Sequence, residues 1–308
     1  MGSASQRSPI VTLLLDPTAS ATLAVDAAFL ARYRAQIDWL LDRLRKSTAG
    51  VRGLIAATPD VIEEDPDHLD AIPQLHPAIV ALFAQAYANY YRTLPAEQRA
   101  AFVGFDGRFF SRCFAEIFMR VFAGNGLRVL RDHDGEPTPT PVTSFMPVAL
   151  GLGGGIMITA SHNPPVFNGI KSSTWYGGVD TDAISERIAA EVRALTAGGG
   201  VIRLGPLPPP ERDPVDAKGI YARTYLGATF DPATLAPLRE ALARGAAFLF
   251  DGLFGVGSMA MRRYLDTLLP DGCWQRGIHL LNERVDPRIG GIAKPDPSDP
   301  NTLVLSGA

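Results

Sequence analysis

The sequence predicts an α/β fold made of two similar three-layer α/β/α domains with mixed, mostly parallel sheets. The first observation is its rhythm. Short apolar runs, typical of buried strands, alternate with longer amphipathic segments, typical of helices. The second is its length, because 308 residues correspond to about two domains of roughly 100–200 residues each. The third is a stretch rich in glycine and proline near residue 205, which separates two such patterns.

The first half of the chain carries the clearest strand–helix–strand pattern. Residues 101–105 and 127–130 are short apolar runs, and residues 110–123 between them place apolar side chains at helical spacing. The sequence Gly-Asn-Gly at 124–126 is typical of a turn that ends a helix. This order predicts parallel strands joined by a crossover helix. We also expect helices at about residues 21–45, 77–91 and 182–195, a strand at 155–159, and irregular structure in residues 1–20.

The second half repeats the alternation after the break. Its expected elements are helices at residues 218–226, 232–244 and 259–269, strands at 246–250 and within 277–282, and a glycine-rich turn at 251–258. We therefore expect an N-terminal extension at residues 1–46, a first domain at residues 47–205 and a second domain at residues 206–308.

Composition argues against several classes of partner. The chain has 29 basic and 32 acidic side chains, so no basic excess is available to neutralise a nucleic-acid backbone. The apolar run at residues 10–15 is far shorter than the roughly 20 residues of a membrane span. Cys113 and Cys273 form no metal-binding pair, as is typical of thiols in a reducing compartment. We expect a cytoplasmic protein that binds neither nucleic acid nor membrane.

Ser161 is the strongest candidate for a reactive residue. It follows the apolar strand predicted at 155–159, and ligands of α/β sheets bind beyond the carboxyl ends of the strands. His162 and Asn163 can each hydrogen-bond an oxyanion, and Lys171 supplies a positive charge ten residues further on. A phosphate on Ser161 would therefore have hydrogen-bond donors and a cation nearby.

Ser161 could instead be the nucleophile of a catalytic triad or a serine that only caps a turn. A triad nucleophile lies in a G-x-S-x-G turn, but here Ala160 and His162 flank the serine. A serine that only caps a turn is the usual interpretation of an isolated Ser-x-Asn. The longer sequence around Ser161 changes that balance.

The segment at residues 155–165, followed by Asn-Gly-Ile-Lys at 168–171, closely resembles the active-site serine loop of the α-D-phosphohexomutases. This family includes phosphoglucomutases, phosphomannomutases and phosphoglucosamine mutases. The resemblance covers about residues 47–305. Further segments that resemble family motifs, in the same order, are 48–53, 104–108 with Ser111, 138–141, 251–257, and 286–291 with Pro295, Asp296, Pro297 and Asn301.

The resemblance implies a function and a set of roles. The family interconverts the 1-phosphate and 6-phosphate of a hexose through a phosphoserine and a hexose bisphosphate intermediate. It implies that Ser161 carries the phosphoryl group, and that Mg²⁺ binds through the phosphate on Ser161. Arg52 and Lys171 would act in proton transfer and charge stabilisation, while His162 and Asn163 would steady the loop and the transferring phosphate. The implied partners are a hexose phosphate and a hexose bisphosphate.

The sequence also departs from the family pattern. Family members have four domains, and their metal-binding loop D-G-D-x-D-R, their sugar-selecting loop G-E-x-S-G and their fourth-domain phosphate loop have no counterpart in these 308 residues. We therefore expect the chain to end before the metal-binding loop. Two acidic clusters could be considered as substitutes: Asp60, Glu63, Glu64, Asp65, Asp67 and Asp70, which we interpret as a solvated face, and Asp180 with Asp182, which we interpret as a helix cap.

Three interpretations of the chain stay open. It is the N-terminal part of a full mutase, or a non-catalytic or regulatory relative that binds a phosphosugar without turnover, or a half that assembles with a separate C-terminal half.

Two weaker signals are also present. The glycines at 252, 255 and 257 fit a tight strand-to-helix turn better than a dinucleotide-binding loop. Trp175 and Tyr176 fit either the mouth of a cleft or ordinary packing.

Overall fold

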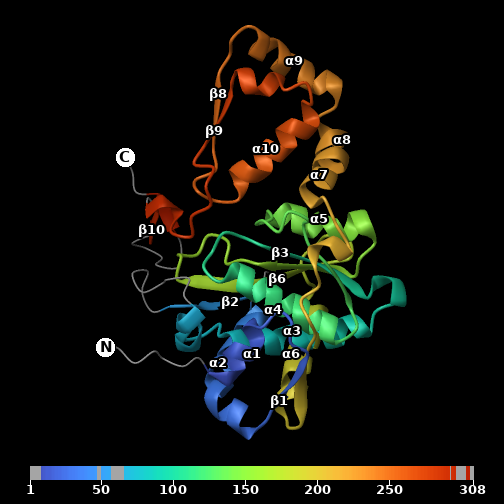
Figure 1. Ribbon diagram of the computed structural model, residues 1–308, viewed down its shortest axis with the longest axis vertical. Coiled ribbons are helices and arrows are strands. Elements are labelled where there is room, and N and C mark those ends of the chain that lie inside the picture. The colour runs from blue at the N-terminus through green and yellow to red at the C-terminus, as the bar shows by residue number, and fades with distance from the viewer. Residues whose placement is uncertain (1–7, 47–49, 57–65, 292, 296–302, 306–308) are drawn as a thin grey trace.

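The computed structural model describes residues 8–46, 50–56, 66–291, 293–295 and 303–305 (Figure 1). It contains two α/β units, which we call the first unit (residues up to 205) and the second unit (residues after 205). Parts of the expected motifs lie outside the described residues. They are Thr48 and Ala49, the acidic residues Asp60, Glu63, Glu64 and Asp65, and Asp296, Pro297 and Asn301.

A five-stranded sheet forms the centre of the first unit. β3 pairs in parallel with β4 and β5, whereas β6 is antiparallel to its neighbours β5 and β2. Four of the five strands therefore run in one direction, which confirms the α/β class with a mixed, mostly parallel sheet. The strands lie in the order β2 (Val51–Leu54), β6 (Phe167–Thr174), β5 (Gly154–Ile158), β3 (Ala100–Phe105) and β4 (Arg128–Leu130).

Helices cover both faces of this sheet. On β3, Ala101 and Val103 belong to the large hydrophobic core, while Ala100 and Phe102 pack in a separate cluster on the other side. A strand buried on both faces is a continuous apolar run, which explains why β3 was predictable. We call the two sides the α3 face and the α5 face. The α3 face packs against α2 (Ala27–Lys46), α3 (Pro77–Arg92), α4 (Ser111–Gly124) and α6 (Asp182–Thr196), and the α5 face against α5 (Thr140–Leu150) and α7 (Ala217–Tyr221).

Two glycines allow α5 to lie close to the sheet. A Cβ atom on Gly104 would lie 2.2 Å from Thr143 Oγ1, and one on Gly155 would lie 2.7 Å from the Thr143 carbonyl oxygen. Both distances are too short for a side chain, so the helix backbone can approach only because these strand positions have none.

The N-terminal segment differs from its prediction. Residues 21–25 were expected to begin a helix, but they form β1 (Ala21–Val25), which pairs antiparallel with β7 (Gly200–Leu204). Residues 1–20 were expected to be irregular, but α1 (Pro9–Leu15) begins after Ser8, whose side chain accepts a hydrogen bond from the Val11 amide. The predicted start of the helix was wrong because pairing with a strand distant in sequence overrides local spacing, and α2 begins at Ala27 instead.

Arg120 holds this N-terminal segment against the first unit. Its guanidinium, fully buried in α4, donates to the carbonyl oxygens of Leu13 (2.9 Å), Leu14 (2.7 Å) and Ala19 (2.8 Å). It also donates to the Gly205 carbonyl oxygen at 3.1 Å. Charged donors of this kind satisfy several carbonyl oxygens that have no secondary-structure partner.

The second unit is smaller and more exposed. Its sheet consists of β8 (Phe248–Asp251) and β9 (Ile278–Leu281), which pair in parallel near the predicted strand positions. Leu242, Leu265 and Trp274 form the centre of its small core. The other elements are a π-helical turn (Ala222–Leu226), α8 (Gly227–Thr229), α9 (Pro232–Ala243), α10 (Gly257–Leu268), and β10 (Ala293–Pro295) paired with β11 (Leu303–Leu305). Short 3₁₀ turns span Pro66–Ala71, Ala96–Gln98, Pro210–Arg212, Cys273–Arg276 and Ile289–Gly291.

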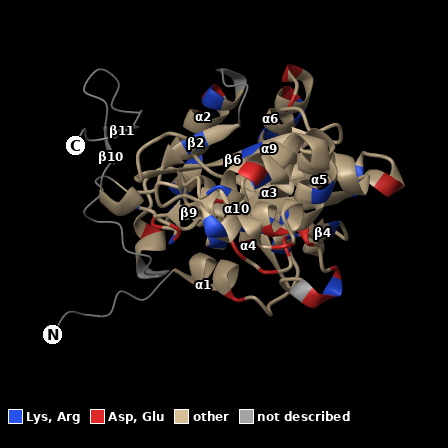
Figure 2. Cartoon of the chain, turned by 90° about the horizontal axis from the view of Figure 1, so that it is seen from above, with Lys and Arg blue, Asp and Glu red and all other residues tan. Residues whose placement is uncertain are grey.

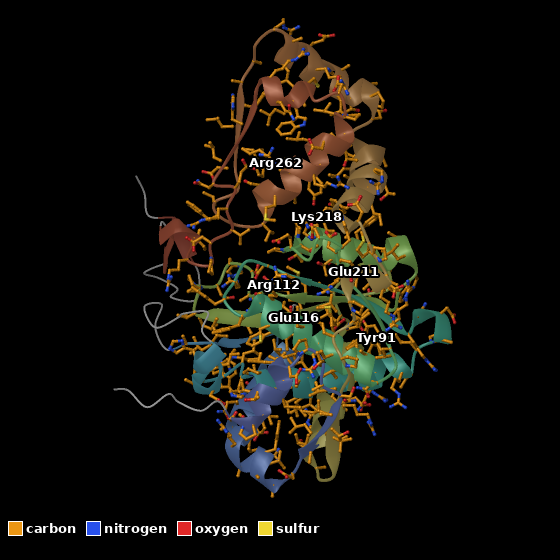
Figure 3. All side chains as sticks on the ribbon, in the orientation of Figure 1. Tyr91, Arg112, Glu116, Glu211, Lys218 and Arg262 are labelled. Atoms are coloured by element: carbon orange, nitrogen blue, oxygen red, sulfur yellow. The ribbon has the colours of Figure 1, made fainter. Side chains whose placement is uncertain are left out.

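A buried ion pair joins the two units. Lys218 of α7, labelled in Figure 3, places its Nζ atom 2.9 Å from Asp132 Oδ2 and 2.8 Å from Asp134 Oδ2. Both aspartates lie in the segment that follows β4. The Lys218 and Asp132 side chains are only 5% and 2% exposed. Only an arrangement of the units that keeps both carboxylates near Lys218 satisfies its buried charge, so the pair favours a single arrangement of the units.

Charges are mixed over the molecule. In Figure 2, Lys and Arg are interspersed with Asp and Glu rather than gathered on one side.

In the described part of the chain, none of the helices combines the length and the apolar character that a bilayer crossing requires.

Candidate active site

A cleft of about 490 Å³ lies between the two units, beyond the carboxyl end of β5. This is the place where α/β sheets bind ligands. The first unit lines it with Asp106, Gly107, Arg108, Thr140, Met157, Thr159, Ser161 and His162. The second unit lines it with Leu253, Phe254, Gly255, Val256, Asp286, Pro287 and Ile289.

Ser161 is exposed in this cleft, as is His162. Its backbone is in the left-handed region, with φ of 57°, and its N–H donates to Thr159 Oγ1 at 2.9 Å. A residue other than glycine rarely adopts this conformation, and such residues cluster at functional sites. Asn163, by contrast, is buried beneath the loop, where its N–H donates to the Ala160 carbonyl oxygen at 3.1 Å.

The sheet register brings the two predicted cations to the same face of the sheet, but neither of them is among the residues that line the cleft. Arg52 on β2 is opposite Gly169 on β6, and Lys171 on β6 is opposite Met157 on β5. Side chains two residues apart on a strand share a face, so Arg52 and Lys171 are diagonal neighbours on the α5 face. Met157 lies on the same face and lines the cleft.

Gly169 lets these side chains fit together. A Cβ atom there would lie 2.6 Å from the Val51 carbonyl oxygen and 3.0 Å from Arg52 Cγ. The aliphatic part of Arg52 therefore passes over a position that only glycine can occupy without displacing a neighbour.

Burial lowers the pKa of both predicted cations. Loss of solvent lowers the pKa of Lys171, and the charges of Arg52 and Arg108 lower it further, while Asp106 opposes the shift. Burial also lowers the pKa of Arg52. Arg52 Nε is buried and has no hydrogen-bond partner among the described residues. Buried donors normally have partners, so this N–H is available to a water molecule or a polar ligand.

A hydrogen-bonded network lies behind the serine loop, and no role was predicted for its residues. The Asp106 carboxylate accepts from Ser111 Oγ at 2.8 Å and from the Arg108 amide at 3.0 Å. Asn168 Nδ2 donates to Ser111 Oγ at 3.0 Å and to the Phe109 carbonyl oxygen at 2.8 Å. These residues were visible only as parts of motif segments, because the contacts of Asn168 that close the network join positions more than fifty residues apart.

The opposite wall of the cleft was also missed. Leu253, Phe254 and Ile289 have left-handed backbones, with φ of 48°, 60° and 55°. Their turns support each other, since the Asp286 amide donates to the Phe254 carbonyl oxygen at 2.9 Å. The glycine-rich turn is a tight connection from β8 to α10, as predicted. It presents an apolar surface to the polar serine loop.

The donor set does not fit Mg²⁺ by itself. Across the ranges that the structure describes, no three His, Cys, Asp or Glu side chains lie close enough together to hold a metal ion. Asp106 and Asp286 both line the cleft, but the Asp106 carboxylate is occupied by Ser111 and Arg108. A Mg²⁺ contact through the phosphate of Ser161 stays a prediction.

Two aromatic residues lie away from the cleft. Trp175 and Tyr176 are 57% and 49% exposed and follow Thr174, which pairs with Gly154 at the start of β5. Ser161 follows the other end of that strand. The interpretation of Trp175 and Tyr176 as the mouth of the cleft is therefore wrong, because register places them at the opposite edge of the sheet.

Comparison with known proteins agrees with this geometry. Residues 44–198 match the family described as phosphoglucomutase/phosphomannomutase, alpha/beta/alpha domain I. A phosphoglucomutase of Staphylococcus saprophyticus is 33% identical over 116 residues, which cover 38% of this chain and 20% of that protein. A phosphoglucosamine mutase of Aromatoleum aromaticum is 33% identical over 193 residues, which cover 62% of this chain and 40% of that protein.

Solved structures give the same fold. A Thermus thermophilus protein described as a phosphomannomutase superposes with a TM-score of 0.59 and 25% identity, over 82% of this chain and 49% of that chain. Parafusin, a phosphoglucomutase from Paramecium, superposes with a TM-score of 0.60 and 20% identity, over 92% and 48% of the two chains. The chain thus spans about half the length of these structures.

The fold and the cleft define an α/β protein with a polar serine loop beyond the carboxyl end of a central strand. Because the family model covers half of its residues, the chain belongs to the phosphoglucomutase/phosphomannomutase family, the α-D-phosphohexomutases.

Proposed function

We propose that the chain is the serine-bearing part of a phosphohexomutase, which interconverts the 1-phosphate and 6-phosphate of a hexose. One observation carries the proposal. Ser161 lies exposed in a cleft, beyond a sheet whose cleft-facing side carries Arg52 and Lys171. The expected domain limits, residues 47–205 and 206–308, and a cytoplasmic location are part of this proposal.

The proposed reaction moves one phosphoryl group in each of two steps. In the first, the bond between phosphorus and Ser161 Oγ breaks and a bond forms to a free hydroxyl of the hexose phosphate. The hydroxyl gives up its proton, and Ser161 Oγ gains one. The bisphosphate then reorients in the cleft, so that its other phosphoryl group faces Ser161. The reverse transfer moves that group to Ser161.

The charged residues are suited to these steps. Because its pKa is lowered, Lys171 can give or take a proton at a pH where an ordinary lysine would stay charged. Arg52 has an unused donor, which can stabilise the charge of the transferring phosphoryl oxygens. We assign His162 to a contact with the phosphoryl group and Asn163 to the shape of the loop.

A second candidate is assembly with further polypeptide. β8 and β9 form a parallel pair, yet Phe248 and Leu249 are 43% and 71% exposed. Parallel sheets are normally covered on both faces. This exposure favours the interpretation that the second unit packs against another segment, such as a separate C-terminal half of a mutase.

The test is transfer to the protein itself. The protein is incubated with a hexose 1,6-bisphosphate and Mg²⁺, and its mass and tryptic peptides are measured. We expect one phosphoryl group on the Ser161 peptide, none in Ser161→Ala, and an unchanged amount in the control Ser185→Ala on α6. Phosphate that persists in Ser161→Ala, or that never appears on the wild-type loop, would rule out the role of Ser161.

A further inference from the structure

Arg108 lies between the serine loop and the start of α4. Its side chain is only 10% exposed to solvent. Its Nη2 atom donates to the carbonyl oxygens of Ser161 and Asn163, each at 2.6 Å. Its Nη1 atom donates to those of Pro164 at 2.9 Å and Phe167 at 3.1 Å. One guanidinium thus gathers four carbonyl oxygens of the loop that carries the reactive serine.

All five N–H bonds of this guanidinium are directed at protein acceptors. The four on Nη1 and Nη2 go to the loop, and the fifth, on Nε, faces Asp106 Oδ2 at 3.4 Å. Arg52 is the opposite case, because its Nε has no partner among the described residues. Although Arg108 lines the cleft, it can donate to a ligand only by releasing the loop.

The loop has a conformation that needs such a support. Ser161 is held with φ of 57°, which is unfavourable for a residue with a side chain. Pro164 and Pro165 have no N–H with which to hydrogen-bond, so fewer backbone bonds can fix the turn. The Pro164 carbonyl oxygen accepts from the Phe167 N–H at 3.0 Å, and the planar fork of donors on Arg108 adds further support to the same turn.

Arg108 is itself fixed from behind. Asp106 accepts from the Arg108 backbone and faces its Nε, and Ser111 donates to the same carboxylate. Asn168, which begins the return from the loop on β6, donates to Ser111 Oγ at 3.0 Å. A chain of contacts therefore runs from Asn168 through Ser111 and Asp106 to Arg108, and from Arg108 back to the serine loop.

We propose that Arg108 is a positioning residue: it fixes the backbone of Ser161 so that Oγ faces the cleft, and it does not bind the transferring phosphoryl group. This inference rests on the proposed function. It implies that Arg108 controls the rate of transfer and leaves the affinity for the phosphosugar to other residues. It also implies that lysine cannot replace arginine, since three donors on one nitrogen cannot reach four separated carbonyl oxygens.

The test compares Arg108→Lys and Arg108→Gln with Arg112→Lys. Arg112 is a matched control, because it lies one turn along in α4, is half exposed and donates to the Gly135 carbonyl oxygen outside the loop. Two quantities are measured: the rate of transfer from a hexose 1,6-bisphosphate to Ser161 over a range of concentrations with Mg²⁺, and hydrogen exchange of the peptide at residues 159–167.

We expect both Arg108 variants to lower the maximal rate about 100-fold, the cost of a reacting group displaced by about 1 Å. The half-saturating concentration should stay at the wild-type value. Exchange should become faster in residues 159–167 and stay slow in α3, whereas Arg112→Lys should change neither quantity.

Three outcomes would overturn the inference. Full rate in Arg108→Lys would mean that only the charge matters, and a rise in the half-saturating concentration that matches the loss of rate would mean that Arg108 binds the ligand. Fast exchange in α3 would mean a general loss of structure. If the wild-type protein accepts no phosphate, the proposed function fails, but exchange in residues 159–167 still decides whether Arg108 holds the loop.

Discussion

The two walls of the cleft differ in composition and in the way they are held. The wall from the first unit is polar, and its loop is fixed by the buried network of Asp106, Arg108 and Ser111 on a sheet covered on both faces. The wall from the second unit is mostly apolar, although Asp286 belongs to it, and it rests on the exposed pair of β8 and β9. Under the proposed function, we expect the first wall to supply the chemistry and the second to shape the space and keep water from it.

The largest expected effect is on the chemistry of Lys171, which lies on the sheet behind the polar wall. Lys171→Ala should lower the rate of phosphoryl transfer by about 10²–10⁴-fold, the usual contribution of a proton-transfer group, with little change in melting temperature. Lys171→Arg is the sharper comparison, because it keeps the charge but holds its proton too tightly to exchange it. A large drop in melting temperature for Lys171→Ala would indicate a structural lysine instead.

The second prediction compares the stability of the two sheets. Phe102 on β3 is fully buried and Phe248 on β8 is 43% exposed. Phe102→Ala should lower the free energy of unfolding by about 3–5 kcal/mol, because it leaves a cavity, and Phe248→Ala by less than about 1 kcal/mol. Chemical denaturation measures both. Equal losses would mean that the β8 surface is covered in solution, as assembly with further polypeptide requires.

The third prediction concerns pH. Burial is the main cause of the lowered pKa of Lys171, and the Arg52 charge adds to it. Arg52→Gln removes only the second cause, so the pKa of Lys171 should rise part of the way towards its ordinary value. The limb of the pH–rate profile that depends on neutral Lys171 should therefore move to higher pH. Arg92→Gln, at the exposed end of α3, should leave the profile in place. An unmoved profile in Arg52→Gln would show that the limb belongs to another group.

The smallest expected effect lies at the opposite end of the sheet. Asp180 accepts hydrogen bonds from Tyr87 and Ser172, and burial raises its pKa above the ordinary 3.8. The folded state therefore holds this proton to a higher pH than the unfolded state, and stability falls as pH rises from about 3.8 through the folded pKa. Asp180→Asn keeps an acceptor without the charge, so it should raise the melting temperature at neutral pH.

The gain in Asp180→Asn should vanish in acid, where the aspartate is protonated in both states. Melting temperatures measured across the pH range check this, with Asp182→Asn at the exposed start of α6 as the control. A gain that persists unchanged at low pH would mean that the carboxylate charge is not its source.

Local sequence was sufficient to locate the serine loop, because its strand, its prolines and its neighbouring polar residues are contiguous. It was insufficient for Arg108, whose carbonyl partners lie 53 to 59 residues away. The apolar wall was missed for the same reason. Leu253 and Ile289 belong to separate turns that meet only in the folded second unit.

The sequence by itself determined the α/β alternation and the burial of strands such as β3, which follow from local hydrophobic patterns. It also singled out Ser161, for which the resemblance to the family predicts phosphate chemistry. Only the tertiary structure decided that residues 21–25 form a strand and that Arg52 and Lys171 share one face of the sheet. It also decided that the N–H groups of the Arg108 guanidinium face protein acceptors, whereas Arg52 Nε has none among the described residues. Pairing register, burial and the directions of donors arise between distant segments, so no local pattern specifies them.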